Sequence, residues 1–512
     1  MKKIFTIDFT KSFIDELSAY IEREFTAQGR SFDKTAIVFG GKRPALFLKR
    51  KLAQTLGQSF VSPRFFTIDE FMDYVANRGE SLQAGLELDR SFTLYGLAKR
   101  LTPQLLKGRE SFAQFLPWAR EILDFIEQLD LEAVDNSALL AIQQNAAIGY
   151  AVPESINDLL KNIKLLREAF HHDLKKRGLT FRGLQYLRAA QEVKKHSWEE
   201  FDDVLFCNLF YFHQTEEDVV RCFYEKDKAR LIFQGDERKW PVLKRIASRM
   251  GCELLEGGQP TPTAFKLHLH AGFDAHSEAA IVRGILSKTK DFDKTVIVLP
   301  NTENVVPLLS ELPADFSNLN VSMGYRLKRS SLYFLFGFIM KAQLSHQGER
   351  YYSRDYLRVL THPFIKNLAV LGNGVLMQVL VHKIEEALTG RVRANISGSS
   401  FITLDEVLSD DEIFELAAKA LPAGVHSSAR ELKESLLKVH EIFFAGWQKV
   451  SDLSAFAGCL GTALDILVDK SFLKKFPLNI NIASRMYDVI REFEDAAFHK
   501  ELFSFDDIVR IF

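Results

Sequence analysis

The sequence has no excess of either charge, few cysteines and no long hydrophobic run. Its 512 residues contain 66 lysines and arginines against 67 aspartates and glutamates, a formal net charge of −1. This balance excludes a polybasic protein that binds nucleic acid through bulk charge, so any such contact has to be local. The four cysteines include no C-x-x-C pair, which predicts neither a disulfide framework nor a structural zinc site.

The sequence also lacks signals for a membrane or for secretion. Its most apolar segment, residues 332–340, is far shorter than the roughly 20 residues of a membrane span. Asp8 interrupts the N-terminal apolar residues before a secretory signal could form. We therefore expect a cytoplasmic protein with no membrane partner. Phenylalanine, by contrast, is abundant, with 43 residues against 13 tyrosines, and we expect these rings mainly in the core.

Strand, turn and helix patterns alternate along the chain and predict an α/β fold. Residues 35–39 form a β-branched run that leads through Gly40 and Gly41 into an amphipathic helix. The other expected strands are residues 203–210, 230–233, 266–270 and 294–299. Thr215 is expected to cap the helix after the second strand. Two glycines and two prolines predict a linker at residues 257–263.

The order of these patterns predicts two parallel-sheet lobes, each interrupted by a helical insertion. The first lobe is expected at residues 1–85 and 201–258, with its insertion at 86–200. The second lobe is expected to begin at 264–330 and to be followed by an insertion at 331–490.

The turn after residues 35–39 comes close to a phosphate-binding loop. Such a loop has the pattern G-x-x-x-x-G-K-[ST], in which lysine contacts phosphate and the hydroxyl binds Mg²⁺. Gly40, Gly41 and Lys42 fit part of it, but Ala36 replaces the first glycine and Arg43 replaces the hydroxyl residue. The sequence therefore predicts a degenerate nucleotide site that does not bind ATP or Mg²⁺, and it predicts no other cofactor.

Hydrolysis would also need acidic residues at the end of a following strand. Asn208 and Leu209 stand there instead, and Glu216 and Glu217 are better explained by the start of a helix. Asp236 occupies a place where a sensor carboxylate could lie, although a turn aspartate has the same appearance. No histidine pair has a third ligand at metal-binding spacing, so the sequence predicts no catalytic residue and no metal site.

Four cations follow the glycine turn: Lys42, Arg43, Lys49 and Arg50. Because they recur at i and i+7, they share a helix face that could meet backbone phosphates. A plain βα turn with a solvated charged face gives the same pattern, and the sequence leaves both interpretations open.

An ordered series of segments resembles the AddB-like proteins, bacterial PD-(D/E)XK nuclease family proteins with an inactivated superfamily I helicase region. The series comprises residues 35–48, 66–71, 294–301, 308–313 and 320–327. Residues 361–364 also resemble part of a UvrD-type second motor lobe. Gly40 and Arg326 depart from the family, which often has proline at these places.

The resemblance implies two RecA-like, P-loop NTPase-like lobes and a DNA-binding module that acts in double-strand break repair and recombination. The expected contacts with single strands or duplex ends are Lys42, Arg43, Lys49, Arg50, Arg326, Lys328 and Arg329. Residues 491–512 would begin the return to the second lobe, which would then be incomplete. The family's nuclease domain would be absent from these residues, and apolar surface of the second lobe would be uncovered.

Two other functions remain open at this point. The chain could be a divergent DNA-dependent ATPase or helicase that uses a nonstandard loop. It could also be a protein-interaction scaffold for an active AddA-like helicase subunit.

Overall fold

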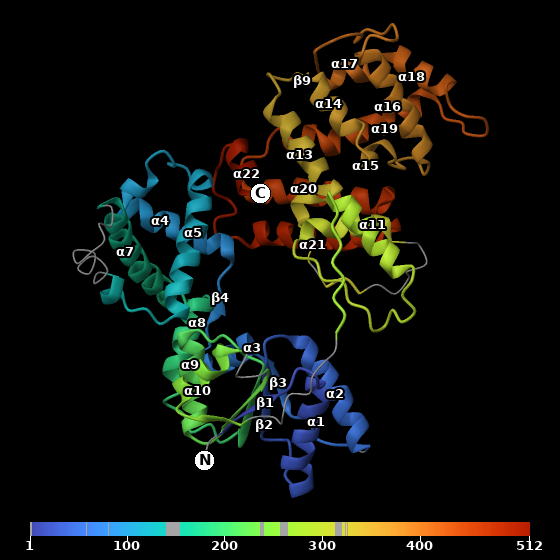
Figure 1. Ribbon diagram of the computed structural model, residues 1–512. Helices are drawn as coiled ribbons and strands as arrows, with labels where there is room; N and C mark the ends of the chain where they lie inside the picture. The colour runs from blue at the N-terminus through green and yellow to red at the C-terminus, as the bar shows by residue number, and fades with distance from the viewer. Residues whose placement is uncertain are drawn as a thin grey trace. The chain divides into compact units, whose positions relative to one another are not determined.

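The computed structural model describes residues 3–57, 59–79, 81–139, 154–235, 240–255, 265–312, 320–322, 324 and 326–512. The chain forms two compact units, Met1–Phe265 and Lys266–Phe512, which are treated separately below (Figure 1). The expected linker at residues 257–263 and Asp236 lie outside the described residues.

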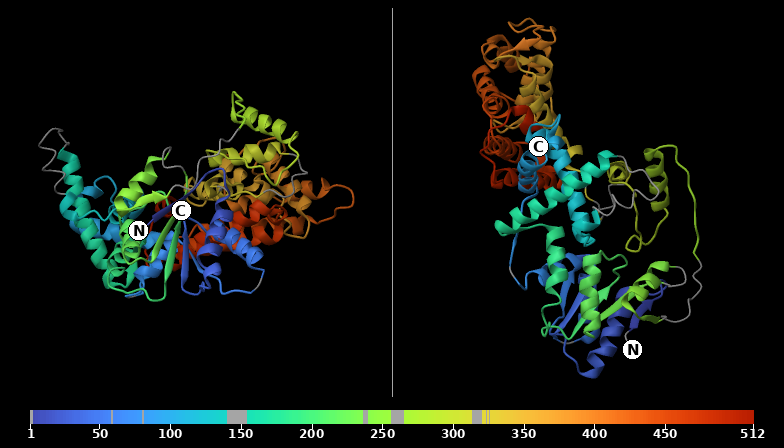
Figure 2. Two further views of the ribbon diagram at one scale, coloured as in Figure 1. Left: turned by 60° about the horizontal axis from the view of Figure 1, so that its bottom comes forward. Right: turned by 90° about the vertical axis from the view of Figure 1, so that its left-hand side faces the viewer.

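The first unit is built on a parallel sheet of six strands in the order β3-β2-β6-β7-β1-β8 (Figure 2). The strands are β1 (Lys3–Ile7), β2 (Thr35–Phe39), β3 (Arg64–Thr67), β6 (Asp203–Cys207), β7 (Ala229–Gln234) and β8 (Glu253–Leu255). Every residue of β2 and β6 is buried. This burial explains their continuous apolar sequences, because a parallel strand is covered on both faces.

Helices cover both faces of this sheet. One face packs on α1 (Phe13–Glu24) and α2 (Lys42–Leu56), through a core that includes Leu17, Leu48 and Leu52. The other face packs on α3 (Ile68–Ala76), α8 (Arg182–Glu192), α9 (Gln214–Glu225) and α10 (Pro241–Met250). The predicted α/β class is confirmed, and the architecture is consistent with a Rossmann or RecA-like lobe.

A helical insertion separates β3 from β6. Its helices are α4 (Glu87–Leu101), α5 (Phe112–Leu131) and α7 (Glu154–Lys176), followed by α8. The short strands β4 (Gln83–Ala84) and β5 (Leu179–Thr180) pair in parallel where the chain enters and leaves it. These helices bury a core of their own, which includes Leu97, Phe115 and Phe170.

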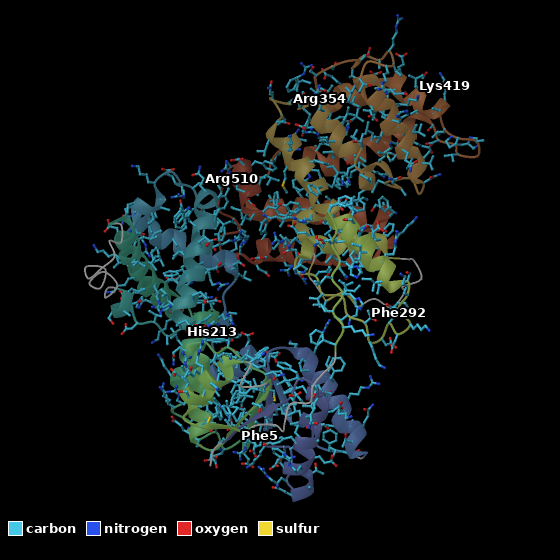
Figure 3. The ribbon with its side chains drawn as sticks, viewed as in Figure 1. Phe5, His213, Phe292, Arg354, Lys419 and Arg510 are labelled. Atoms are coloured by element: carbon cyan, nitrogen blue, oxygen red, sulfur yellow. The ribbon has the colours of Figure 1, made fainter. Side chains whose placement is uncertain are left out.

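Polar contacts join the insertion to the sheet. The Thr215 hydroxyl donates to the Leu131 carbonyl at 2.8 Å. His213, labelled in Figure 3, has its Nδ1 2.7 Å from Glu132 Oε1. The expectation that Thr215 caps its helix is wrong, since α9 begins earlier, at Gln214. The Thr215 side chain is instead used to fix the end of α5.

The second unit is mostly helical. Its longer helices are α11 (Ala275–Leu286), α13 (Ser331–Leu344), α16 (Gly374–Leu388), α19 (Ala429–Phe443), α20 (Leu453–Lys470) and α21 (Pro477–Asp495). Shorter helices are α12 (Val305–Glu311), α14 (Ser353–Leu360), α15 (Pro363–Lys366), α17 (Leu404–Leu408), α18 (Asp411–Lys419) and α22 (Phe505–Ile511). Strands β9 (Tyr351–Tyr352) and β10 (Phe401–Ile402) form one antiparallel pair.

The described part of the second unit contains no second parallel sheet. Residues 266–270 and 295–299 have no strand partner there, and Leu269 and Val296 are more than four-fifths exposed. A strand needs a neighbouring strand for its backbone hydrogen bonds, and the described residues supply none. The predicted second lobe at residues 264–330 therefore stays a prediction.

The apolar residues 332–340 lie in α13, where Leu335, Phe336 and Ile339 are fully buried in the unit. Throughout the described ranges, no helix combines the length and the apolar character that crossing a bilayer would demand.

Two buried hydrogen-bonding groups in the second unit make its stability depend on pH. His440 Nε2 lies 2.7 Å from the Tyr356 hydroxyl, and both side chains are buried. Burial lowers the pKa of His440 from 6.5 to about 3. Since the unfolded chain binds the proton and the folded chain does not, stability is complete above pH 6.5 and falls as the pH decreases toward 3.

We expect His440→Gln to abolish the uptake of one proton that accompanies unfolding of the wild type below pH 6.5. Below pH 6.5, the wild-type unit should lose about 1.4 kcal/mol per pH unit more than the variant. Hydrogen exchange of peptides from α14 and α19, compared at about pH 7.5 and about pH 5.5 after correction for intrinsic rates, measures the difference. Equal pH slopes in the two proteins would contradict this assignment.

Candidate functional site

The order of the strands identifies where a nucleotide-binding lobe would hold its ligand. In an open parallel sheet, ligands bind beyond the carboxyl ends of two neighbouring strands whose connections leave toward opposite faces. Such a place is called a switch point. Strands β1 and β7 are such neighbours, because β1 leads to α1 on one face and β7 leads to α10 on the other. Strands β2 and β6 are a second pair, leading to α2 and α9.

The loop at the first switch point does not have the form of a phosphate loop. It consists of Asp8, Phe9, Thr10, Lys11 and Ser12, so it is short and contains no glycine. Two of its backbone N–H groups are engaged within the loop: Thr10 donates to Asp8 Oδ1 at 2.8 Å and Lys11 to the Asp8 carbonyl at 3.1 Å. A phosphate needs several such groups directed toward it.

The polar side chains of this loop also have partners. Ser12 caps α1 by accepting from the Asp15 N–H at 3.4 Å. Lys11 Nζ lies 3.2 Å from Glu16 Oε1, one turn into the same helix. The sequence-based search did not find this loop, because the glycine signal that identifies phosphate loops is missing and strand order cannot be read locally.

Aromatic rings close the edge of the sheet beside this loop. Phe9 packs on Trp240, with ring centroids 5.2 Å apart, and Trp240 packs on Phe210 at 5.3 Å. Phe210 in turn contacts Phe233 of β7 at 5.6 Å. These rings come from the loops that follow β1, β6 and β7, where phosphate and metal ligands would be expected.

Asn208, which replaces the expected acidic residue, has a structural role. Its side-chain oxygen accepts from the Gln234 N–H at 2.6 Å, and its own N–H donates to the Ile232 carbonyl at 2.9 Å. Its φ of 56° is left-handed, a conformation that asparagine tolerates better than most residues. Asn208 therefore ends β6 and ties this strand to β7.

The two glutamates downstream are also engaged. Glu216 accepts from the His213 N–H at 2.9 Å at the start of α9, and burial raises its pKa. Glu217 is buried between Arg221 and Arg249, with its Oε2 2.7 Å from Arg249 Nη1. Both carboxylates stabilise helix contacts, as their position in the first turn indicated.

At the second switch point, Gly40 and Gly41 form the turn between β2 and α2. Gly41 is the N-cap of α2, with an extended φ of −162° and no side-chain cap. A Cβ atom on Gly41 would meet nothing within 4 Å, and one on Gly40 would make only an ordinary contact with Leu209. The turn therefore does not depend on glycine for its conformation.

The four cations predicted after the glycine turn, Lys42, Arg43, Lys49 and Arg50, lie on α2, which carries five lysines and arginines and no acidic residue. Lys42 Nζ lies 3.1 Å from Glu70 Oε1, and Lys49 Nζ lies 4.8 Å from the centroid of the Phe65 ring. Arg43 and Arg50 are exposed on the face opposite the buried Leu48 and Leu52. Cations in the first turn of a helix are electrostatically unfavourable, so this sequence is not explained by helix stability.

Two large apolar side chains are exposed on the same face of α2. Leu46 is 64% exposed and Phe47 is 62% exposed. Helical spacing places both beside the line from Arg43 to Arg50. We call Arg43, Leu46, Phe47 and Arg50 the α2 face. It combines positive charge with an accessible ring.

The remaining predicted contacts lie in the second unit. Arg326, Lys328 and Arg329 are exposed at the 3₁₀ turn Leu327–Arg329, just before α13. Arg329 forms an ion pair with Glu303. The structure brings these three residues together, and they belong to a different unit from the α2 face.

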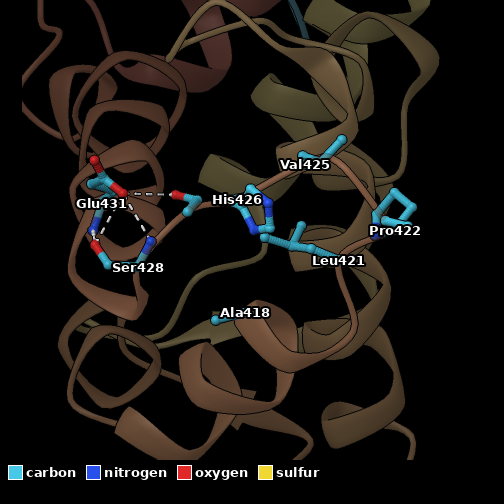
Figure 4. Close-up of a pocket in the computed structure, with 9 residues that line it drawn as sticks. Ala418, Leu421, Pro422, Val425, His426, Ser428 and Glu431 are labelled. Atoms are coloured by element: carbon cyan, nitrogen blue, oxygen red, sulfur yellow. Dashed lines mark hydrogen bonds between the residues drawn. The ribbon is translucent and has the colours of Figure 1, made fainter.

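A cavity of about 390 Å³ is present in the second unit. It lies in the loop between α18 and α19 and is lined by residues that include Leu421, His426 and Glu431 (Figure 4). The Glu431 carboxylate accepts from the Ser428 N–H at 2.8 Å and from two serine hydroxyls, and these hydrogen bonds lower its pKa. That carboxylate caps α19.

Across the described ranges, no group of three or more histidine, cysteine, aspartate or glutamate side chains could hold a metal ion. Comparison with models of known protein families finds no match. Comparison with curated proteins finds no match either.

Proposed function

We propose that this chain is a catalytically inactive, RecA-like, helicase-like module that binds DNA within an AddB-like helicase-nuclease of double-strand break repair. The observation that carries the proposal is the α2 face, where two arginines flank exposed apolar side chains on the helix that follows β2 of a parallel sheet. Positive charge attracts phosphates, and an accessible ring offers a base a stacking surface.

The β1–α1 loop supports the absence of ATP-driven activity. It contains no glycine, two of its N–H groups are engaged within the loop, and Phe9 packs on Trp240 beside it. In this proposal the degenerate nucleotide site lies at residues 8–12 rather than at the predicted Gly40, Gly41 and Lys42, because β1 and β7 are neighbours with connections on opposite faces. The turn at Gly40 and Gly41 then belongs to the DNA-binding surface.

A salt titration tests the proposal. Fluorescence anisotropy with a labelled single-stranded oligonucleotide should show binding at about 50 mM salt that weakens steeply toward about 200 mM. The same measurement with a blunt duplex and with a tailed duplex compares the affinity for single strands with the affinity for duplex ends. Failure of all three probes at low salt would refute the proposal, since phosphate contacts are strongest there.

We also expect millimolar Mg²⁺-ATP to leave the melting temperature of the protein unchanged. A ligand present at 100 times its dissociation constant stabilises the folded state by about 2.7 kcal/mol, which would shift melting by several degrees. Differential scanning fluorimetry with ATP, ADP and no nucleotide measures the shift. A rise specific to nucleotide would favour the divergent ATPase instead.

A further inference from the structure

The carboxyl edge of the first sheet has a second surface of rings and cations, distinct from the α2 face. Three loops contribute to it, because β6, β7 and β1 are neighbours in the sheet and run in parallel. The aromatic residues of these loops are Phe9, Phe210, Tyr211, Phe212 and Trp240.

Tyr211 is the most accessible of these rings. It is 82% exposed, whereas Phe210 beneath it contacts Trp240 and Phe233. A tyrosine with this exposure gains little from burial, so packing does not explain the residue. Its neighbours in the loop are packed and hold the backbone that presents it.

Two arginines of α10 lie beside Tyr211. Arg245 and Arg249, four residues apart on one helix face, line a cavity of about 70 Å³ together with Tyr211. Arg249 is held by its 2.7 Å contact with the buried Glu217. Helix α10 carries a third cation, Lys244, and no acidic residue.

We propose that Tyr211, Arg245 and Arg249 form a second binding site for single-stranded nucleic acid, in which one base stacks on Tyr211 and its phosphate contacts Arg245. A flat exposed ring next to guanidinium groups matches a base next to a phosphate. A duplex would offer phosphates only, because its bases are already stacked. This second site rests on the proposed function and specifies it further, because it makes unpaired bases the group that this part of the carboxyl edge recognises.

The second site and the α2 face lie on opposite sides of the sheet, since α10 packs on one face and α2 on the other. Strand β7, which leads to α10, lies two positions from β2, with β6 between them. Neighbouring strands are about 4.8 Å apart, so the two strand ends are separated by about 10 Å. A strand that reached both surfaces would have to cross the carboxyl edge of the sheet, past the ends of β2, β6 and β7.

We expect Tyr211→Ala to weaken binding of a single-stranded oligothymidylate about tenfold, the loss typical of one stacked base. The variant should bind an abasic oligonucleotide of the same length, and a blunt duplex, as the wild type does. A merely structural role would weaken all three ligands equally. Phe125→Ala removes another partly exposed ring, on α5, and serves as the matched control, with unchanged binding expected.

Photocrosslinking of the wild-type protein provides a second measurement that needs no variant. An oligonucleotide with 5-iodouracil at each position in turn should crosslink to the peptide that contains Tyr211, as mapped by mass spectrometry. Arg245→Ala should reduce affinity and the salt slope while leaving the crosslink site unchanged.

The outcomes separate the two proposals. Binding that depends on the α2 face, with Tyr211→Ala equal to the wild type and no crosslink at Tyr211, would overturn the second site and leave the proposed function standing. Absence of single-strand binding by the wild type would overturn both. Crosslinking at Tyr211 with a tenfold loss confined to ligands that have unpaired bases would support both.

Discussion

The double substitution Arg43→Glu, Arg50→Glu is expected to weaken single-stranded DNA binding about 100-fold at low salt. The two guanidinium groups are seven residues apart on α2 and lie on one exposed face. Each charge-assisted contact contributes about 1.5–3 kcal/mol, so the loss of two contacts accounts for at least this factor. The reversed charges would add repulsion from the phosphates.

The salt dependence of binding should change as well as its strength. Loss of two phosphate contacts lowers the slope of log affinity against log salt by about 1.4 for a single strand. Anisotropy titrations between about 50 and about 200 mM salt measure both quantities. A purely structural effect would lower affinity without changing the slope in this way.

Lys175→Glu with Lys176→Glu is the matched control. Both residues are exposed at the end of α7, and the change in net charge is the same. We expect only the small effect of the altered net charge on a distant ligand, which salt screens. Equal losses in the two double variants would show that binding depends on net charge alone and would contradict a site on α2.

The α2 face could be predicted from the sequence because its signals are local. A β-branched run, a glycine turn and apolar residues at helical spacing identified β2 and α2, and Leu48 and Leu52 are buried as expected. The recurrence of cations at i and i+7 placed them on one face. The exposure of Phe47 is not indicated by the sequence, because the abundance of phenylalanine predicts rings that lie mainly in the core.

The position of the switch point could not be predicted in the same way. It depends on β1 lying between β7 and β8, which joins residues more than 200 positions apart in the chain. The loop after β1 has no glycine, so the usual phosphate-loop pattern is absent. The sequence instead drew attention to Gly40 and Gly41, a turn whose conformation does not require glycine.

The second lobe shows what local patterns leave undetermined. Residues 266–270 alternate as a strand would, and the helix α11 follows them. A strand is completed only by its neighbour, and the described residues supply no neighbour for this one. Leu267 and Leu269 are accordingly exposed, at 72% and 86%.

Asp130→Ala is expected to destabilise the helical insertion by about 3–5 kcal/mol, the cost of removing one partner of a buried ion pair. Asp130 is fully buried, with Oδ1 2.6 Å from Arg167 Nη2 and Oδ2 2.9 Å from His171 Nε2. Arg167 also donates to the Val134 carbonyl and to Asn136, both at 2.8 Å. Without Asp130, the buried guanidinium would keep its charge and lose its counterion.

Hydrogen exchange localises this effect to the insertion. Peptides from α5 and α7 should exchange at least 100-fold faster in the variant, while peptides from the second unit should not change. Asp124→Ala, an exposed position on the same helix, should leave all rates unaltered. The pair Asp130→Ala, Arg167→Leu should recover part of the loss, because it removes the unpaired charge along with its partner. If the double variant were no more stable than Asp130→Ala alone, the loss would come from the cavity rather than from the charge.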